Sequence, residues 1–292
     1  MRELTQLFAE AEVSALIEHP DFRPACESVA RAAVAYFIRL EPDYRWLTKD
    51  LGRAAIGLTA PPLDSTEGGL NGQGLYAACR ASGFASAGRV LAVVERLQRI
   101  GELTIESGPD HWTRRPMRLS PRFSRRFRER ARIELDGLRR LAPEAEVMKA
   151  MIDDPRGFVR YIWNVGLFSN LRRDLYGFDG QGPTDFFMSR EAGMLILFDL
   201  LGSQPVERAQ FLQSAKLSRN ALSQRYGVSR AHINKLLAAA SAAGYLTCPR
   251  TDRVDFAPVL SASLERQFAL VFQLSRAAGL AALAGRSGLQ AP

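Results

Sequence analysis

Apolar residues between positions 222 and 247 recur at helical spacing, and two glycines divide the stretch. The run LSQRYG predicts a helix that ends at Gly227, because glycine readily adopts the left-handed conformation that closes many helices. A second helix is expected to begin after Ser229, whose hydroxyl can accept a hydrogen bond from an unpaired backbone N–H. Such a short connection makes the helices cross sharply, as in a helix-turn-helix. The positions predicted to face inward are Val228, Ile233, Leu236, Leu237 and Ala240.

Polar residues gather on the outward, N-terminal part of this second helix. In a helix-turn-helix that part is presented to the major groove, where side chains donate hydrogen bonds to base edges and phosphates. The pattern therefore predicts a DNA-reading helix, and an ordinary helical hairpin inside a core is the alternative. The candidate DNA-binding residues are Ser229, Arg230, His232, Asn234 and Lys235.

The segment after this helix predicts a β-hairpin. Gly244 ends the helix, and YLTCPRTDRVDF then reads as a strand, a turn around residues 249–252 and a returning strand. Arg250 and Arg253 lie near the predicted tip, where a wing contacts phosphate or the minor groove, and are further candidates. A helix-turn-helix followed directly by a hairpin is a winged helix. Over most of its C-terminal half the chain resembles the MarR-type winged-helix regulators, and that resemblance implies double-stranded DNA as a partner.

A related pattern occurs earlier, in GFASAGRVLAVVERLQRIGELTIES at residues 83–107. Ser86 corresponds to Ser229 and Gly101 to Gly244 (229 − 86 = 244 − 101 = 143). Upstream, ALIEHP ending at residue 20 is similar to AMIDDP ending at residue 155 (155 − 20 = 135). Both offsets are close to half of the 292 residues, so the pattern indicates a tandem duplication. Chance similarity between alanine-rich helices is the alternative.

The duplication predicts a mainly α fold with small β wings, in which two winged helix-turn-helix domains lie in tandem. The resemblance to MarR-type proteins, which are two-fold dimers joined by terminal helices, implies that long terminal helices relate the halves by a pseudo-two-fold axis. The expected first half is 1–142, with its helix-turn-helix at about 74–100 and its wing at about 102–119. The expected second half is 143–292, with its helix-turn-helix at about 218–243 and its wing at about 245–256.

The terminal helices are expected at residues 124–141 and 262–284, and the aromatic-rich stretch 157–178 is expected to fill the middle of the shared core. Because one chain then supplies both halves, we expect a monomer that acts as a pseudo-dimer. MarR-type proteins carry one winged-helix domain per chain, whereas this chain is expected to carry two. The resemblance therefore leaves open whether this chain binds a small-molecule effector.

The two predicted recognition helices differ at their outward positions. In register, Asn234 corresponds to Leu91 and Lys235 to Ala92. Either the first half contacts the DNA backbone while the second reads sequence, or the first half has another role. The candidates in the first half are Ser86, Arg89, Arg114 and Arg115.

Charge supports a nucleic-acid partner. The net charge is +8 and the isoelectric point about 9.8, and the densest arginine run is RRPMRLSPRFSRRFRERAR at residues 114–132. Arginine binds phosphate through a bidentate fork, so an arginine-rich wing and following helix is a plausible DNA footprint. The alternative is a solvated helix face on which glutamates such as Glu129 and Glu134 neutralise the arginines.

Other classes of protein find little support. No apolar run reaches the roughly 20 residues of a membrane helix, and the N-terminus reads as an acidic amphipathic helix rather than a signal peptide. The three cysteines and three histidines show no metal-ligand spacing. GGLNGQG at residues 68–74 lacks the Lys-Ser/Thr pair of a phosphate loop, and a flexible linker is expected there. We therefore expect no cofactor, no metal, no enzymatic activity, no membrane partner and a cytoplasmic, nucleoid-associated location.

Three functions fit these expectations. The leading one is a sequence-specific transcription regulator, repressor or activator, that binds a pseudo-palindromic site in double-stranded DNA. The second is a replication initiator built from tandem winged helices. The third, from a different class, is a winged-helix scaffold for protein partners, which the arginines in the first wing disfavour.

Overall fold

The computed structural model describes residues 2–66, 68–81, 86–171, 182–204 and 210–285. Over these residues the chain is mainly helical and carries a two-stranded and a three-stranded antiparallel sheet. The prediction of a mainly α fold with small β elements is confirmed at this level. None of the described helices combines the length and the apolar character that a bilayer crossing requires.

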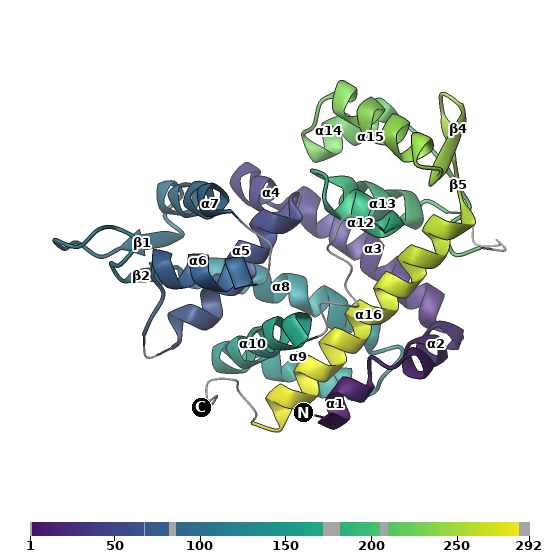
Figure 1. The fold of residues 1–292 in the computed structure, drawn as a ribbon. Helices are drawn as coiled ribbons and strands as arrows, with labels where there is room; N and C mark the ends of the chain where they lie inside the picture. The colour runs from purple at the N-terminus through teal and green to yellow at the C-terminus, as the bar shows by residue number, and fades with distance from the viewer. Residues whose placement is uncertain (1, 67, 82–85, 172–181, 205–209, 286–292) are drawn as a thin grey trace.

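In the first half of the chain, helices precede a small hairpin and one long helix follows it (Figure 1). The acidic N-terminal stretch, expected as one helix, is divided into two. The elements are α1 (Arg2–Gln6), α2 (Glu10–Glu18), α3 (Phe22–Arg39), α4 (Pro42–Thr48), α5 (Leu51–Asp64), α6 (Gly72–Ala81), α7 (Ala87–Arg99), β1 (Leu103–Ile105), β2 (Met117–Leu119) and α8 (Pro121–Leu138).

A similar order of elements follows in the second half. The elements are α9 (Ala145–Asp153), α10 (Pro155–Leu171), α12 (Pro183–Met188), α13 (Gly193–Gly202), β3 (Ser214–Lys216), α14 (Arg219–Tyr226), α15 (Arg230–Ala242), β4 (Leu246–Arg250), β5 (Arg253–Phe256) and α16 (Pro258–Leu283). Both long helices, α8 and α16, begin earlier than expected, because Pro121 and Pro258 occupy the first helical position, where the fixed φ of proline suits a helix start.

The sheets are small and antiparallel. Leu103 of β1 lies opposite Leu119 of β2, and β5 is the central strand of the order β3-β5-β4. The short strand β3 was not expected from the sequence. In the first half Leu70 forms an isolated bridge to Met117. The expected flexible linker at residues 68–74 is thus an ordered connection, in which Leu70 is buried and Asn71 Oδ1 accepts a hydrogen bond from Gly74 N–H at 2.8 Å.

Glycine and serine set the helix ends in α14 and α15 as expected. Gly227 closes α14 in the left-handed conformation, with φ of 60° and ψ of 42°. Ser229 Oγ accepts a hydrogen bond from His232 N–H at 3.0 Å and so caps α15. In the first half Ser86 caps α7 in the same way, through Arg89 N–H at 3.4 Å. Gly83 lies outside the described residues.

Helices of the two halves pack against one another reciprocally (Figure 1). α3 of the first half contacts α13 of the second, and α10 of the second contacts α5 of the first. Likewise α8 contacts α9, and α16 contacts α2. Within each half the long helix contacts its own central helix, α8 with α3 and α16 with α10. Each half therefore completes the core of the other.

Two glycines permit close approach at these contacts. A β-carbon at Gly137 on α8 would lie 2.2 Å from Cγ2 of Val29 on α3. A β-carbon at Gly279 on α16 would lie 2.3 Å from Sδ of Met148 on α9. A larger side chain at Gly137 would force Val29 or α8 to move, and one at Gly279 would displace the side chain of Met148. The aromatic stretch expected in the core does contribute there: Phe158, Tyr161 and Phe168 of α10 are buried, whereas residues 172–178 lie outside the described part of the chain.

Candidate nucleic-acid interface

Helix α15 presents one apolar and one polar face, as its sequence predicts. The inward prediction is confirmed for Ile233, Leu236, Leu237 and Ala240, all of which are buried, and Val228 is half-buried. The opposite face carries hydrogen-bond donors that no other part of the described chain covers. The exposed candidates are Ser229, Arg230, Asn234 and Lys235.

His232 differs from the other candidates on this helix. Its side chain is half-buried, and Nε2 lies 3.0 Å from the carbonyl oxygen of Glu191. The sequence predicted that His232 lies on the solvent-facing side with the other polar residues, and this placement is wrong, because the ring turns toward the loop before α13. We therefore regard His232 as a residue that holds α15 in place.

The second hairpin carries a row of three cations across its sheet, called the cation row below. Lys216 of β3 is the register partner of Arg253 of β5, and Arg253 in turn is the partner of Arg250 of β4. Directly paired residues on neighbouring strands project to the same face of a sheet. All three side chains are exposed, although Arg253 also forms an ion pair with Asp255 at 2.7 Å. Sequence reasoning missed Lys216 because it missed β3.

The N-terminal part of α7 exposes fewer hydrogen-bond donors than the N-terminal part of α15. Ser86 and Arg89 are exposed at its N-terminal end, as expected. Leu91 is a large apolar side chain with 37% of its surface exposed, at the register position of Asn234. Few groups on the N-terminal part of α7 are therefore able to recognise base edges by hydrogen bonding.

The first hairpin has a long connection between β1 and β2 that carries Arg114 and Arg115. Arg114 is exposed, whereas Arg115 is half-buried, and a β-carbon at Gly108 would lie 3.8 Å from the Cδ of Arg115. Trp112 packs at the base of this connection, where a β-carbon at Gly72 would lie 2.9 Å from the tryptophan Cζ3. Of the two arginines, Arg114 is thus the better placed for a partner.

The arginines of α8 are mostly engaged within the chain, as the alternative of a helix face with neutralised arginines expects. Arg128 donates to the carbonyl oxygen of Asp153 at 2.9 Å, and the carboxylate of Glu102 is fully buried beneath Arg122. Such contacts join α8 to the turn before β1, to the residue that precedes α4, and to the end of α9. The ion pairs are Arg122 with Glu102, Arg126 with Glu41, Arg130 with Glu134, and Arg132 with Asp153.

An ionic cluster at the start of α13 joins α15 to the first half of the chain. Glu191 lies 3.2 Å from Lys49 Nζ and 2.9 Å from Arg53 Nη2. Burial raises the pKa of Glu191, but the hydrogen bond from Arg53 and the charges of Lys49 and Arg53 outweigh burial and lower this pKa overall. The next residue, Ala192, has a φ of 60°, which is costly for a side-chain-bearing residue, and its N–H donates to Lys49 O at 2.7 Å. The cluster therefore fixes the loop that His232 contacts.

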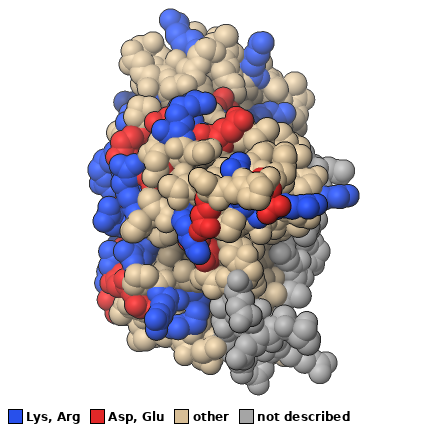
Figure 2. All heavy atoms as spheres, turned by 90° about the vertical axis from the view of Figure 1, so that its left-hand side faces the viewer, with Lys and Arg blue, Asp and Glu red and all other residues tan. Residues whose placement is uncertain are grey.

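The charged surface is uneven. Figure 2 shows the side of the molecule that carries the first hairpin, and there basic and acidic side chains are interspersed, in keeping with the ion pairs of α8. At the upper end of the same view, the level of α14 and α15 in Figure 1, basic side chains project from a mostly uncharged surface. Exposed positive charge therefore lies both on the side of the first hairpin and at the level of the second helix–hairpin unit, where fewer acidic side chains accompany it in this view.

The arrangement brings exposed donors of α15 and the cation row into one helix–hairpin unit, which suits contact with a polyanion. Among the described residues, no group of three or more His, Cys, Asp or Glu side chains is placed to hold a metal ion. Cys26 and Cys79 are buried free thiols, and burial raises the pKa of Cys79 to about 11, so this thiol stays protonated near neutral pH.

No protein-family model matches the chain, and neither a curated protein nor a solved structure matches it.

Proposed function

We propose that this protein is a sequence-specific transcription regulator that binds double-stranded DNA as a single-chain pseudo-dimer. The observation that carries the proposal is the juxtaposition of α15, with Arg230, Asn234 and Lys235 exposed, and the cation row on the adjoining hairpin. A helix with donors able to recognise base edges, next to cations able to contact phosphates, supplies both components of sequence-specific binding.

The order of elements supports a winged-helix reading of each half. α6 and α7 precede the β1–β2 hairpin, and α14 and α15 precede the β4–β5 hairpin. In both units a serine, Ser86 or Ser229, caps the second helix. In both units a glycine with positive φ, Gly101 or Gly244, ends that helix. Two helices at a short turn followed by a hairpin are the parts of a winged helix-turn-helix.

Reciprocal packing supports the pseudo-dimer. In a two-fold dimer, each contact from element i to element j is repeated from j to i. The contacts of α3 with α13 and of α10 with α5 repeat one another in this manner, as do those of α8 with α9 and α16 with α2. The fused halves thus take the place of two subunits and hold α7 and α15 at a set separation.

The two halves contribute unequally in this proposal. α15 reads bases through Asn234 and Lys235, whereas α7, with Leu91 and Ala92 at the same positions, binds mainly through Ser86, Arg89 and the backbone contacts of the first hairpin. The resulting site is an imperfect palindrome, with the stronger sequence requirement in the half bound by α15.

Genome-wide mapping of the tagged protein, followed by gel shift with the recovered sequence, tests the proposal. We expect discrete sites upstream of genes, bound much more tightly than random duplex of the same length at the same salt concentration. An array of repeats at a replication origin would instead indicate an initiator. Equal binding to all duplexes, or no binding to DNA, would reject sequence-specific regulation.

A further inference from the structure

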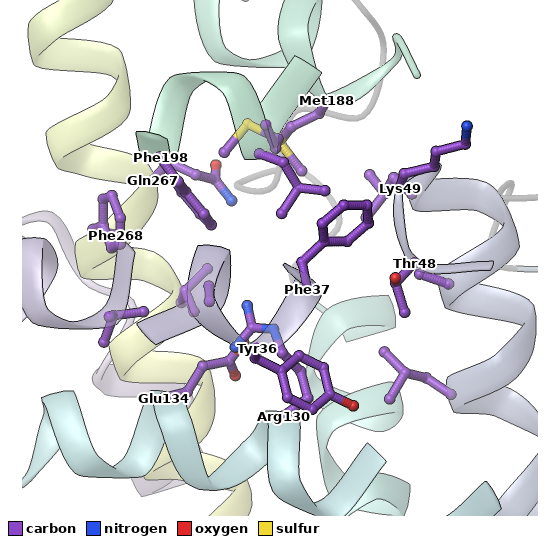
Figure 3. A pocket seen from close by; sticks show the side chains of 18 of the residues that line it. Tyr36, Phe37, Thr48, Lys49, Arg130, Glu134, Met188, Phe198, Gln267 and Phe268 are labelled. Carbon is purple, nitrogen blue, oxygen red and sulfur yellow. The ribbon is translucent and has the colours of Figure 1, made fainter. Parts of the chain in front are cut away.

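A cavity of about 300 Å³ lies between helices that belong to both halves of the chain (Figure 3). α3, α4, α5 and α8 contribute from the first half, and α12, α13 and α16 contribute from the second. Its volume is at the lower end of the range typical for small-molecule sites, roughly 300–1,000 Å³. Space of this size is large for a packing defect, because protein interiors seldom leave voids much larger than a water molecule.

The cavity lies where the two long helices meet, at equivalent positions of each. Phe127 and Arg130 of α8 correspond to Leu264 and Gln267 of α16, counting from the proline that begins each helix (258 − 121 = 264 − 127 = 267 − 130 = 137). All four residues line the cavity. The space therefore occupies a central position between the halves and belongs to neither one alone.

The walls are largely apolar. Aromatic and aliphatic side chains line the space, among them Phe37, Leu58, Phe198 and Phe268. On the α3 side the wall is formed in part by the small side chain of Ala33. The corresponding position of α10 carries Phe168 (168 − 33 = 155 − 20 = 135). At this position α3 therefore has a methyl group, whereas α10 has a buried phenyl ring. An apolar ligand body fits such a space.

The charged groups at the cavity are mostly neutralised. Arg126 is paired with Glu41, Arg130 with Glu134 at 3.0 Å, and Lys49 with Glu191 at 3.2 Å. The hydroxyl of Tyr36 donates to the carbonyl oxygen of Arg126 at 2.7 Å, and burial raises the pKa of Tyr36, which therefore stays protonated. These groups leave no net charge for a ligand to balance.

Arg190 is the exception. Its guanidinium lies 3.5 Å from the centre of the Phe186 ring and donates to the carbonyl oxygen of Phe186 and the hydroxyl of Ser189. Among the described residues it has no carboxylate partner. Gln267 extends from α16 toward the space (Figure 3), and its amide has no hydrogen-bond partner in the described part of the chain. The cavity thus offers one uncompensated cation and one free neutral donor.

We infer that this cavity is a binding site for a small amphipathic monoanion, a carboxylate with an aliphatic or aromatic body. The apolar walls bury the body, and Arg190 balances the carboxylate, which Gln267 can also contact through its amide N–H. One molecule binds per chain, because the site is formed jointly by the two halves. This inference goes beyond the proposed DNA binding and holds whether or not the protein binds DNA.

Calorimetry and thermal unfolding without DNA test the site, with decanoate, 1-decanol and decylamine as probes, the two ionic probes below their micelle concentrations and 1-decanol below its solubility limit. We expect decanoate to bind with a stoichiometry of one and to raise the unfolding temperature. Decanol should bind about tenfold or more weakly, and decylamine should not bind. Equal binding of all three probes, or no binding of decanoate, would overturn the inference.

Variants assign the binding to this cavity. Ala33→Phe, which introduces the residue that α10 carries at the equivalent position, should abolish binding of every probe; Ala54→Leu makes the same test if the first variant does not fold. Arg190→Gln should remove the preference for decanoate over decanol, whereas Arg39→Gln, an exposed arginine at the end of α3, should leave both affinities unchanged. Unaltered decanoate binding in a folded Ala33→Phe or Ala54→Leu variant, or a preserved preference in Arg190→Gln, would also overturn it.

Discussion

Lys49 Nζ donates a hydrogen bond to the carbonyl oxygen of Gly227 at 3.2 Å, although 178 residues separate the two. Gly227 forms the turn between α14 and α15, and Lys49 lies just before α5 of the other half. The same ammonium group is paired with Glu191, whose carbonyl oxygen contacts His232. The position of α15 therefore depends on residues from both halves of the chain.

The ionic cluster should make stability depend on pH. Because the folded-state pKa of Glu191 is lowered below its usual value of 4.5, its ionised form stabilises the folded state above that pH, and this contribution is lost as pH falls through the lowered pKa. We expect Glu191→Gln to lower the unfolding temperature at pH 7 and to have little effect near pH 3. Thermal unfolding at a series of pH values measures this, with Glu146→Gln on the exposed side of α9 as control. A loss of equal size at both pH values would show that ionisation of Glu191 is not responsible.

The proposed base reading by α15 can be tested separately from general DNA affinity. Asn234→Ala and Lys235→Ala should each weaken binding to the specific site by about 1–3 kcal/mol and leave binding to random duplex nearly unchanged. Fluorescence anisotropy with both duplexes at fixed salt provides the comparison. Lys149→Ala, on α9, removes a lysine far from α15 and should alter neither affinity. Equal losses on the two duplexes would contradict a base-reading role.

The cation row should act through phosphates. Lys216→Ala and Arg250→Ala should weaken binding to all duplexes alike and reduce the slope of log affinity against log salt by about one unit each. We expect the same of Arg114→Ala, with a smaller effect for Arg115→Ala because that side chain is half-buried. Arg132→Ala, which loses an intramolecular pair with Asp153, should leave the slope unchanged. Slopes that do not differ from wild type in the first three variants would exclude these cations from the interface.

The fused halves should behave as one unit. Light scattering after size exclusion should give a monomer of 32.3 kDa, and footprinting should show two unequal half-sites about one helical turn apart. Cleavage at the exposed Pro143 should give fragments that are poorly soluble when separated, because each exposes the helices that pack on the other half. A stable homodimer on four half-sites, or one fragment that binds with full affinity, would be incompatible with a pseudo-dimer.

Occupancy of the central cavity should alter DNA binding. A ligand between α5 and α13 fixes a separation that must otherwise adjust to the DNA, so we expect decanoate to weaken specific binding roughly 5- to 150-fold. Because linkage is reciprocal, saturating DNA should weaken decanoate binding by the same factor. Titrations in both orders measure the two factors, and DNA binding by Ala33→Phe should not respond to decanoate. An unchanged DNA affinity at saturating decanoate would show that the cavity and the DNA face are independent.

Features fixed by a few neighbouring residues could be predicted from the sequence. Gly227 and Ser229 set the ends of α14 and α15 through local backbone conformation and one short hydrogen bond, and both predictions are confirmed. The alternation of buried and exposed positions in α15 is likewise a local consequence of helical spacing.

Features that depend on distant partners could not be predicted. The strand β3 is only three residues long and exists because β5 pairs with it, so the position of Lys216 was missed. In the sequence Arg126 belongs to a basic run, but in the structure Glu41, 85 residues away, pairs with it and neutralises its charge. His232 has the spacing of an outward residue, and only the loop at Glu191 turns its ring inward. The cavity is harder still to predict, since it reflects volume that side chains from seven helices leave empty.

The reciprocal contacts of α3 with α13 and α10 with α5 also bear on how the protein responds to its own abundance. When two separate chains must meet, the amount of dilute active dimer rises with the square of the chain concentration. Under the proposed function, one folded chain is already complete, so the occupied fraction of a DNA site at low abundance should change in direct proportion to copy number. Dilution of such a regulator by cell growth should then lower site occupancy gradually, whereas dissociation of a two-chain dimer would lower it more steeply.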